Sequence, residues 1–73
     1  MSVSKQLIHL RNVKGISQEE LASLMNVTRQ AVSKWETDQT LPDSEKIIRL
    51  SEIFGVTTDY LLKGKETDPM DIY

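Results

Sequence analysis

Apolar residues in this chain recur every three or four positions, which is the spacing of one buried face on an α-helix. Val3, Leu7 and Leu10 lie at i, i+4 and i+7 and predict a first helix over residues 3–13. No segment alternates with a period of two, so no strand is predicted. The remaining predicted apolar positions are Leu21, Ala22, Leu24, Met25, Ala31, Val32, Trp35, Ile47, Leu50, Ile53, Phe54, Val56, Tyr60, Leu61 and Leu62. The pattern is that of an all-α protein.

Capping residues divide this pattern into helices. Ser17 and Glu20 have the spacing of a capping box, so a second helix is expected from residue 18. Asn26 tolerates a left-handed backbone and suits the turn that follows, and Thr28 is an N-cap for a third helix. Other expected start or stop residues are Gly15, Pro42, Asp43, Gly55, Thr57 and Gly64. Five helices are therefore predicted.

The segment 18–36 contains two short helical patterns joined by a tight turn. Counted from Gln18, a small residue, Ala22, stands at +4, Asn26 at +8 and Val32 at +14. A small residue lets two helices approach closely, and the asparagine suits the turn between them. This combination resembles the helix-turn-helix unit, whose second helix enters the major groove of DNA.

The third predicted helix carries a polar face opposite its apolar one, formed by Arg29, Gln30, Ser33 and Lys34. Arginine can make two hydrogen bonds to a guanine edge, and glutamine can make two to an adenine edge. These four residues are candidate base-reading side chains. The alternative interpretation is an ordinary solvated face with no ligand.

Two segments carry a resemblance to a known family, GISQEELASLMNVTRQAVSKWE and LPDSEKIIRLSEIFGVTTDYLLKG. They resemble the Cro/C1-type helix-turn-helix domain, the XRE-like family of phage repressors and bacterial transcription regulators. The resemblance covers about residues 3–64 and implies a compact five-helix, phage-repressor-like domain. It implies a sequence-specific, double-stranded DNA-binding transcriptional regulator, and it favours a repressor. The expected partner is a palindromic operator, bound by a homodimer.

The same resemblance implies roles for individual residues. Arg11 and Glu36 are expected to form a partly buried ion pair, although they could be two unrelated surface charges. The surface near the last helix makes the dimer contact in relatives, so Val56, Tyr60 and Leu61 are dimer candidates, although each could belong to the core. The expected phosphate contacts are Gln18, Thr28 and Gln39.

The loop after the reading helix departs from the family pattern. Relatives have Asn-Gly and a basic residue where this chain has Thr37, Asp38 and Gln39. Asp38 is expected to take the left-handed backbone that glycine usually takes there, and its charge would face phosphate. Weaker DNA binding, or a smaller dependence on salt, is therefore expected than in a typical relative.

Charge is unevenly distributed along the chain. The formal net charge is −2; residues 1–34 hold five basic and two acidic side chains, whereas residues 35–73 hold four basic and nine acidic ones. The basic half contains the proposed reading helix.

Residues 1–64 are predicted to form one domain, and residues 65–73 a flexible acidic tail or the start of a linker. The net charge also leaves open a protein-interaction module, such as an antitoxin or adaptor, on the same fold.

Other function classes find little support in the sequence. Without cysteine there is no thiolate zinc site, and His9 has no partner at ligand spacing, so no metal or cofactor is expected. No catalytic constellation or glycine-rich phosphate loop is present, so neither an enzyme nor a small-molecule substrate is expected. The chain lacks an apolar run long enough for a membrane span, and the prediction is a soluble, cytoplasmic protein.

Overall fold

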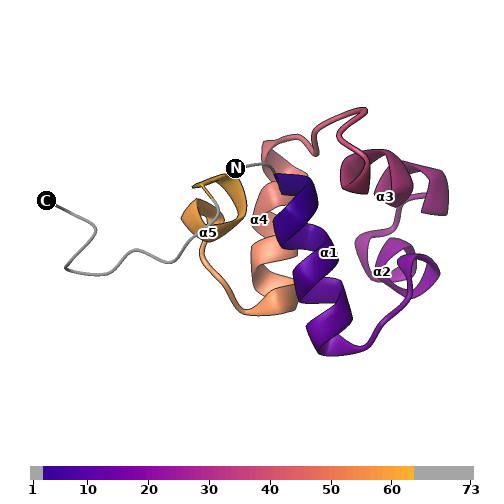
Figure 1. Cartoon of the computed structure of the whole chain (residues 1–73), viewed down its shortest axis with the longest axis horizontal. Coiled ribbons are helices and arrows are strands. Elements are labelled where there is room, and N and C mark those ends of the chain that lie inside the picture. The colour runs from indigo at the N-terminus through magenta and orange to yellow at the C-terminus, as the bar shows by residue number, and fades with distance from the viewer. Residues whose placement is uncertain (1–2, 64–73) are drawn as a thin grey trace, which may run out of the picture.

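A computed structural model describes residues 3–63 of the chain. Within this range there are five helices and no strand, which confirms the all-α prediction (Figure 1). The helices are α1 (Val3–Lys14), α2 (Gln18–Met25), α3 (Arg29–Glu36), α4 (Ser44–Phe54) and α5 (Thr58–Lys63). The predicted stop at Gly64 and the predicted tail at 65–73 lie outside the described residues.

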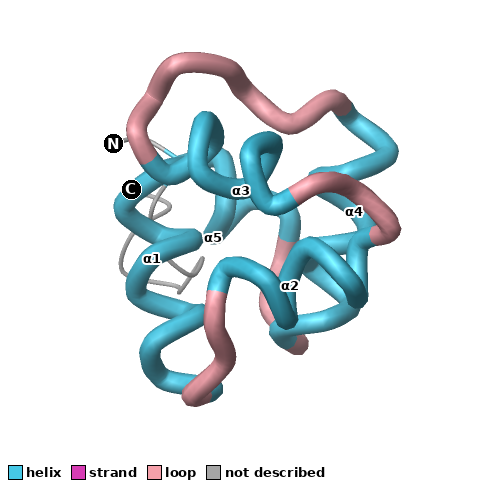
Figure 2. Tube along the Cα trace, turned by 90° about the vertical axis from the view of Figure 1, so that its right-hand side faces the viewer, coloured by secondary structure: helices cyan, strands magenta, loops and turns pink. Residues whose placement is uncertain are grey.

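The arrangement places α2 and α3 together at one end of the molecule and α5 at the other (Figure 1). Helix α1 contacts both α3 and α5, while α2 packs against α3 and α4. The loop between α3 and α4 crosses the top of the molecule (Figure 2). The pair α2–α3 is thus supported from behind by the rest of the domain, which leaves an outer side of α3 open.

The core lies where the five helices meet. It contains Val3, Leu7, Leu21, Ala22, Met25, Val32, Trp35, Ile47, Leu50 and Leu61. Two leucines predicted on apolar faces, Leu24 and Leu62, are instead about half exposed. In α2 the buried residues are Leu21, Ala22 and Met25, and Leu24 points about 100° away from the centre of that face. The sequence pattern was wrong for Leu24 because an apolar residue beside a buried stripe need not belong to it.

Local capping fixes the turn between α2 and α3. Ser17 and Glu20 form both hydrogen bonds of the predicted capping box at the start of α2. Asn26 ends this helix in the left-handed conformation, with φ 58° and ψ 44°. The Thr28 hydroxyl oxygen accepts from the Ala31 backbone N–H at 3.2 Å and caps α3. These bonds set the direction in which α3 leaves the turn.

Candidate nucleic-acid interface

Helix α3 has one face in the core and another in solvent. Val32, Trp35 and Glu36 are buried. On the opposite side Arg29, Gln30 and Lys34 are exposed, and Ser33 is half-buried. The structure therefore brings the four predicted base-reading side chains to one helix, with three of them exposed to solvent.

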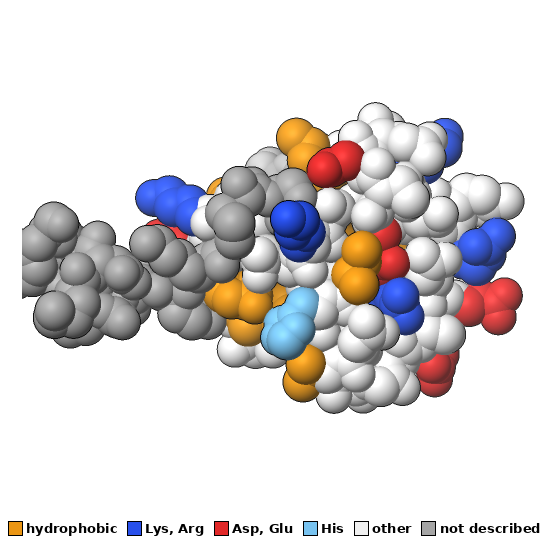
Figure 3. All heavy atoms as spheres, viewed as in Figure 1, with side chains coloured by type: hydrophobic (Ala, Val, Ile, Leu, Met, Phe, Trp, Pro, Cys, Tyr) orange, Lys and Arg blue, Asp and Glu red, His pale blue; other side chains and the backbone are white. Residues whose placement is uncertain are grey.

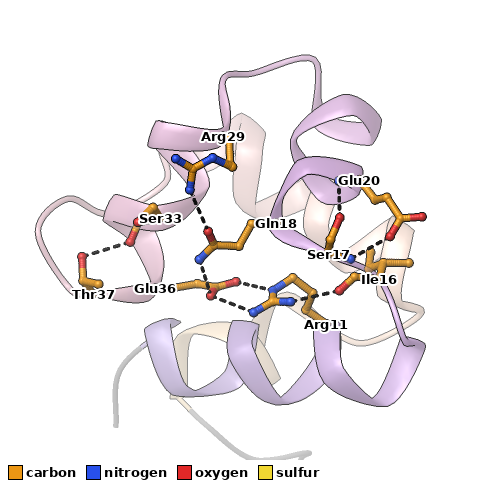
Figure 4. Close-up of polar contacts among 9 residues, drawn as sticks. All are labelled: Arg11, Ile16, Ser17, Gln18, Glu20, Arg29, Ser33, Glu36 and Thr37. Carbon is orange, nitrogen blue, oxygen red and sulfur yellow. Dashed lines mark hydrogen bonds and ion pairs between the residues drawn. The ribbon is translucent and has the colours of Figure 1, made fainter.

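The buried end of α3 is tied to α1 by an ion pair, as predicted. Arg11 Nε lies 2.8 Å from Glu36 Oε2, and Arg11 Nη2 donates to Oε1 at 3.2 Å. The third guanidinium nitrogen, Nη1, donates to the Ile16 carbonyl at 3.0 Å (Figure 4). The Arg11 and Glu36 side chains are 17% and 5% exposed. The hydrogen bond to Glu36 and the attraction of its charge raise the pKa of Arg11, although burial acts in the opposite direction.

Gln18 stands between the two ends of α3. Its amide nitrogen donates to Glu36 Oε1 at 3.0 Å, and its amide oxygen accepts from Arg29 Nη1 at 3.3 Å (Figure 4). Gln18 was expected to contact phosphate, and these two bonds were not predicted. No spacing rule could have found them, since the three residues belong to different turns of two helices.

The other two predicted phosphate contacts, Gln39 and Thr28, lie at opposite ends of α3. Asp38 has the expected left-handed backbone, with φ 64°. Gln39 is exposed, and its side-chain amide donates to the Thr37 hydroxyl at 2.9 Å. Thr28 is exposed at the other end of the helix. Thr28 and Gln39 therefore flank the polar face of α3, and Asp38 adds a negative charge beside it.

The three dimer candidates differ in their exposure. Leu61 is 0% exposed and lies in the core, so its assignment to a dimer contact was wrong. It follows the start of α5 by one helical turn and points inward against the other helices. Val56 and Tyr60 are half-buried, and Val56 packs against the core. They remain candidates.

An apolar surface that was not predicted from the sequence lies beside them. A hollow of about 380 Å³ is lined by Pro42, Ser44, Ile47, Ile48, Thr58 and Leu62. Two of its apolar side chains are largely open to solvent, Ile48 at 52% and Leu62 at 51%, and the nearby Leu41 is 70% exposed. It combines residues from the end of the α3–α4 loop, from α4 and from α5, which only the tertiary fold brings together.

Charged side chains of both signs are scattered over the face seen in Figure 3, and they form no single basic patch there.

His9 is exposed. Among residues 3–63, no group of three or more histidine, cysteine or acidic residues is placed to hold a metal ion. None of the helices in the described part of the chain is both long and apolar enough to cross a membrane.

A capped left-handed turn between two short packed helices, the second with an exposed polar face, defines a helix-turn-helix domain. Residues 7–61 match the sequence model of the helix-turn-helix family. The chain belongs to this family, in its Cro/C1-type, XRE-like branch.

Two proteins with similar sequences are described as helix-turn-helix transcription regulators, in agreement with this assignment. The chain is 41% identical over 66 residues to the HTH-type transcriptional activator BcrR of Enterococcus faecalis, covering 90% of this chain and 32% of that protein. It is 42% identical over 60 residues to the SPbeta prophage-derived uncharacterized HTH-type transcriptional regulator YonR of Bacillus subtilis, covering 82% of this chain and 56% of that one. The chain thus spans less than two thirds of the length of these relatives.

A solved structure is similar over almost the whole domain. It is the P22 c2 repressor protein in complex with a synthetic operator, with a TM-score of 0.84 and 31% identity. The alignment covers 89% of this chain and 98% of that one. The two structures therefore have the same fold over the aligned residues.

Proposed function

We propose that this chain is the sequence-specific, double-stranded DNA-binding domain of a transcriptional regulator, with α3 lying in the major groove. The observation that carries the proposal is the exposed set Arg29, Gln30 and Lys34 on a helix whose opposite face is anchored in the core. The similarity to the P22 c2 repressor, which was solved with operator DNA, supports the same role for α3.

Each residue then has a distinct task. Arg29 and Gln30 each make paired hydrogen bonds to a base edge, and each such pair gives about 1–3 kcal/mol of discrimination. Lys34 and Ser33 add contacts further along the groove. Thr28 and Gln39 bind the phosphate backbone at the two ends of the helix, which fixes its register on the duplex.

Occupancy of an operator supports repression where the bound site overlaps that of the polymerase. We propose this repressor role for the domain. The similar proteins named above include an activator, BcrR, and a repressor, P22 c2. The choice between the two outcomes depends on where the operator lies relative to the promoter, because the domain itself does the same thing in both cases.

A protein-interaction module is the second candidate function, because the net charge is −2 and Asp38 opposes phosphate. Salt dependence separates the two. Affinity for a labelled duplex is measured by fluorescence anisotropy from 50 to 300 mM salt. A DNA-binding domain loses affinity linearly on logarithmic axes, with a slope set by the number of phosphates neutralised. Absence of duplex binding at the lowest salt from a folded protein would favour the protein-interaction role.

Asp38 provides the first prediction. Asp38→Asn removes the charge and keeps a residue that tolerates a left-handed backbone. An exposed charge near phosphate costs at most about 1 kcal/mol in water, so we expect DNA affinity to rise by up to about fivefold at 50 mM salt. The gain should shrink at 300 mM salt, where the interaction is screened. An unchanged or lower affinity at low salt would mean that Asp38 does not face the DNA backbone. Glu45→Gln, an exposed charge change in α4, is the matched control.

We further propose that the domain binds as a homodimer through the apolar hollow between α4 and α5. One α3 reads only a short half-site, so useful specificity requires two copies on a palindrome, with half-sites about 34 Å apart. The hollow includes Pro42, near the end of the loop that leaves α3, so a second copy seated there lies beside that loop. Four of the nearby charges are paired within α4 or its cap, Lys46 with Asp43 at 3.9 Å and Arg49 with Glu52 at 3.8 Å. These two pairs add no net charge beside the hollow.

The dimer surface is tested by placing a charge in it. Ile48→Glu should abolish two-copy binding to a palindromic duplex, as measured by sedimentation velocity, and lower operator affinity at least tenfold. The matched control is Val13→Glu, an exposed apolar residue on α1, which should leave both unchanged. Two-copy binding that survives Ile48→Glu would exclude this surface and leave Val56 and Tyr60 as the candidates.

A further inference from the structure

Thr37, the C-cap of α3, lies on the same side of the helix as the proposed base-reading residues. Its backbone N–H donates to the Ser33 carbonyl at 3.0 Å, which is the hydrogen bond of a continuing helix. At 100° per residue counted from Arg29, Thr37 falls at about 80°, between Ser33 at about 40° and Gln30 at about 100°. Thr37 is also exposed. The polar face of α3 therefore extends one residue beyond the last helical residue.

The hydroxyl group of Thr37 is already used within the protein. It donates to the Ser33 carbonyl at 2.9 Å (Figure 4), and a longer contact of 3.4 Å reaches the Lys34 carbonyl. The side-chain amide of Gln39 donates to the same hydroxyl oxygen at 2.9 Å. A hydroxyl has a single proton to donate, so Thr37 has none left for a phosphate oxygen or for the acceptors of a guanine edge. Bonding either of these groups would break the bond to Ser33.

The group that Thr37 offers to a ligand is therefore its methyl group. In the major groove, thymine presents an apolar C5 methyl group, and threonine methyl groups are among its partners. From Arg29 to Thr37 the helix is about 12 Å long at 1.5 Å per residue, and the major groove is about 12 Å wide. The whole face from Arg29 to Thr37 therefore fits within the groove.

We propose that Thr37 is a specificity-determining residue, whose methyl group contacts the C5 methyl group of one thymine in each operator half-site. This inference rests on the proposed function of α3 as the reading helix. It adds an apolar contact to the hydrogen bonds assigned to Arg29 and Gln30. Its signature is a dependence of affinity on the thymine methyl group, which a phosphate contact or a hydroxyl contact by Thr37 does not produce.

Two substitutions separate the methyl group of Thr37 from its hydroxyl group. Thr37→Val keeps a methyl group and removes the hydroxyl, whereas Thr37→Ser keeps the hydroxyl and removes the methyl. The end of α3 is also held by the backbone N–H groups of residues 38 and 39, which donate to carbonyls of its last turn at 3.4 and 2.9 Å. We therefore expect both variants to fold, which circular dichroism checks.

The DNA supplies the matching change. An operator is selected from random duplexes with the wild-type protein, and each thymine of one half-site is then replaced in turn by deoxyuridine, which lacks only the C5 methyl group. Affinities are measured by fluorescence anisotropy at one salt concentration. Burial of a methyl group corresponds to roughly a fourfold change in affinity. We expect one position where deoxyuridine lowers the affinity of wild type and of Thr37→Val about threefold to fivefold, and where Thr37→Ser binds both bases equally.

Thr40→Ser is the matched control, because Thr40 is an exposed threonine in the loop that follows α3. It should keep the full wild-type response to deoxyuridine at every position. A thymine methyl group that contacts another residue of α3 keeps its deoxyuridine response in Thr37→Ser, so it is distinguished from the thymine that faces Thr37.

The inference is overturned if Thr37→Ser keeps every deoxyuridine response of the wild type, or if Thr37→Val loses a response that Thr37→Ser keeps. The second result would assign the contact to the hydroxyl group. Failure of the wild-type protein to select any duplex would instead overturn the proposed function, and the thymine contact with it.

Discussion

Trp35→Ala will destabilise the domain by about 3–5 kcal/mol, because it removes a large aromatic side chain from a small core. Trp35 is 5% exposed and packs among residues from several helices of the core cluster. A domain of 73 residues has a total stability of about 4–11 kcal/mol, at about 0.05–0.15 kcal/mol per residue, so the loss takes between about a third and all of it. Thermal and urea unfolding, followed by circular dichroism, measure the effect.

The control for this experiment lies on the same helix. Lys34→Ala changes an exposed residue next to Trp35 and should leave the unfolding midpoint within about 2 °C of wild type, because exposed substitutions away from caps or networks have small effects. A near-normal midpoint for Trp35→Ala would contradict the burial of this side chain and, with it, the anchoring of α3.

Arg11→Met carries the second-largest expected effect. It keeps the aliphatic stem of Arg11 but leaves the Glu36 carboxylate, 5% exposed, without its cation. Removing one partner of a buried ion pair costs about 3–5 kcal/mol, because the remaining charge is desolvated and unpaired. Urea unfolding should therefore show a much lower midpoint. Lys5→Met, an exposed position on the same helix, should behave as wild type.

Replacing both Arg11 and Glu36 shows whether the loss of stability comes from the unpaired charge or from lost packing. Arg11→Met combined with Glu36→Leu should recover most of the stability, since a well-packed apolar pair can replace a buried ion pair. Stability of the double variant as low as that of Arg11→Met would mean that lost packing, rather than an unpaired charge, causes the damage.

The helices and their boundaries could be predicted because their causes are local. The capping box at Ser17, the left-handed Asn26 and the N-cap Thr28 each depend on a few consecutive residues, and the structure confirms all three. Burial was harder to predict, because it depends on which neighbour a helix meets. Leu24 was expected inside and is half exposed, and Leu61, offered as a dimer candidate that could equally belong to the core, is fully buried.

In the candidate site, too, local features could be predicted from the sequence and tertiary contacts could not. The exposure of Arg29, Gln30 and Lys34 could be predicted from helical period alone, since they lie outside the apolar face that contains Val32 and Trp35. The link through Gln18 could not, because it joins residues on two helices through distances set by the tertiary fold. The apolar hollow escaped prediction for the same reason. The Arg11–Glu36 pair was expected only through the family resemblance, and its geometry follows from α1 packing against α3.

Selection from a random duplex library tests the central claim most directly. It is carried out with the wild-type domain and with a variant in which Arg29, Gln30 and Lys34 are all alanine, and each is also prepared as a fusion to a dimerising segment. All three residues are exposed, so the triple variant should fold as the wild type does, which circular dichroism checks. We predict that the wild type enriches one palindrome and that the triple variant enriches none. No enrichment by the folded wild type, even as a forced dimer, or the same palindrome from the triple variant, would contradict the assignment of α3 as the reading helix.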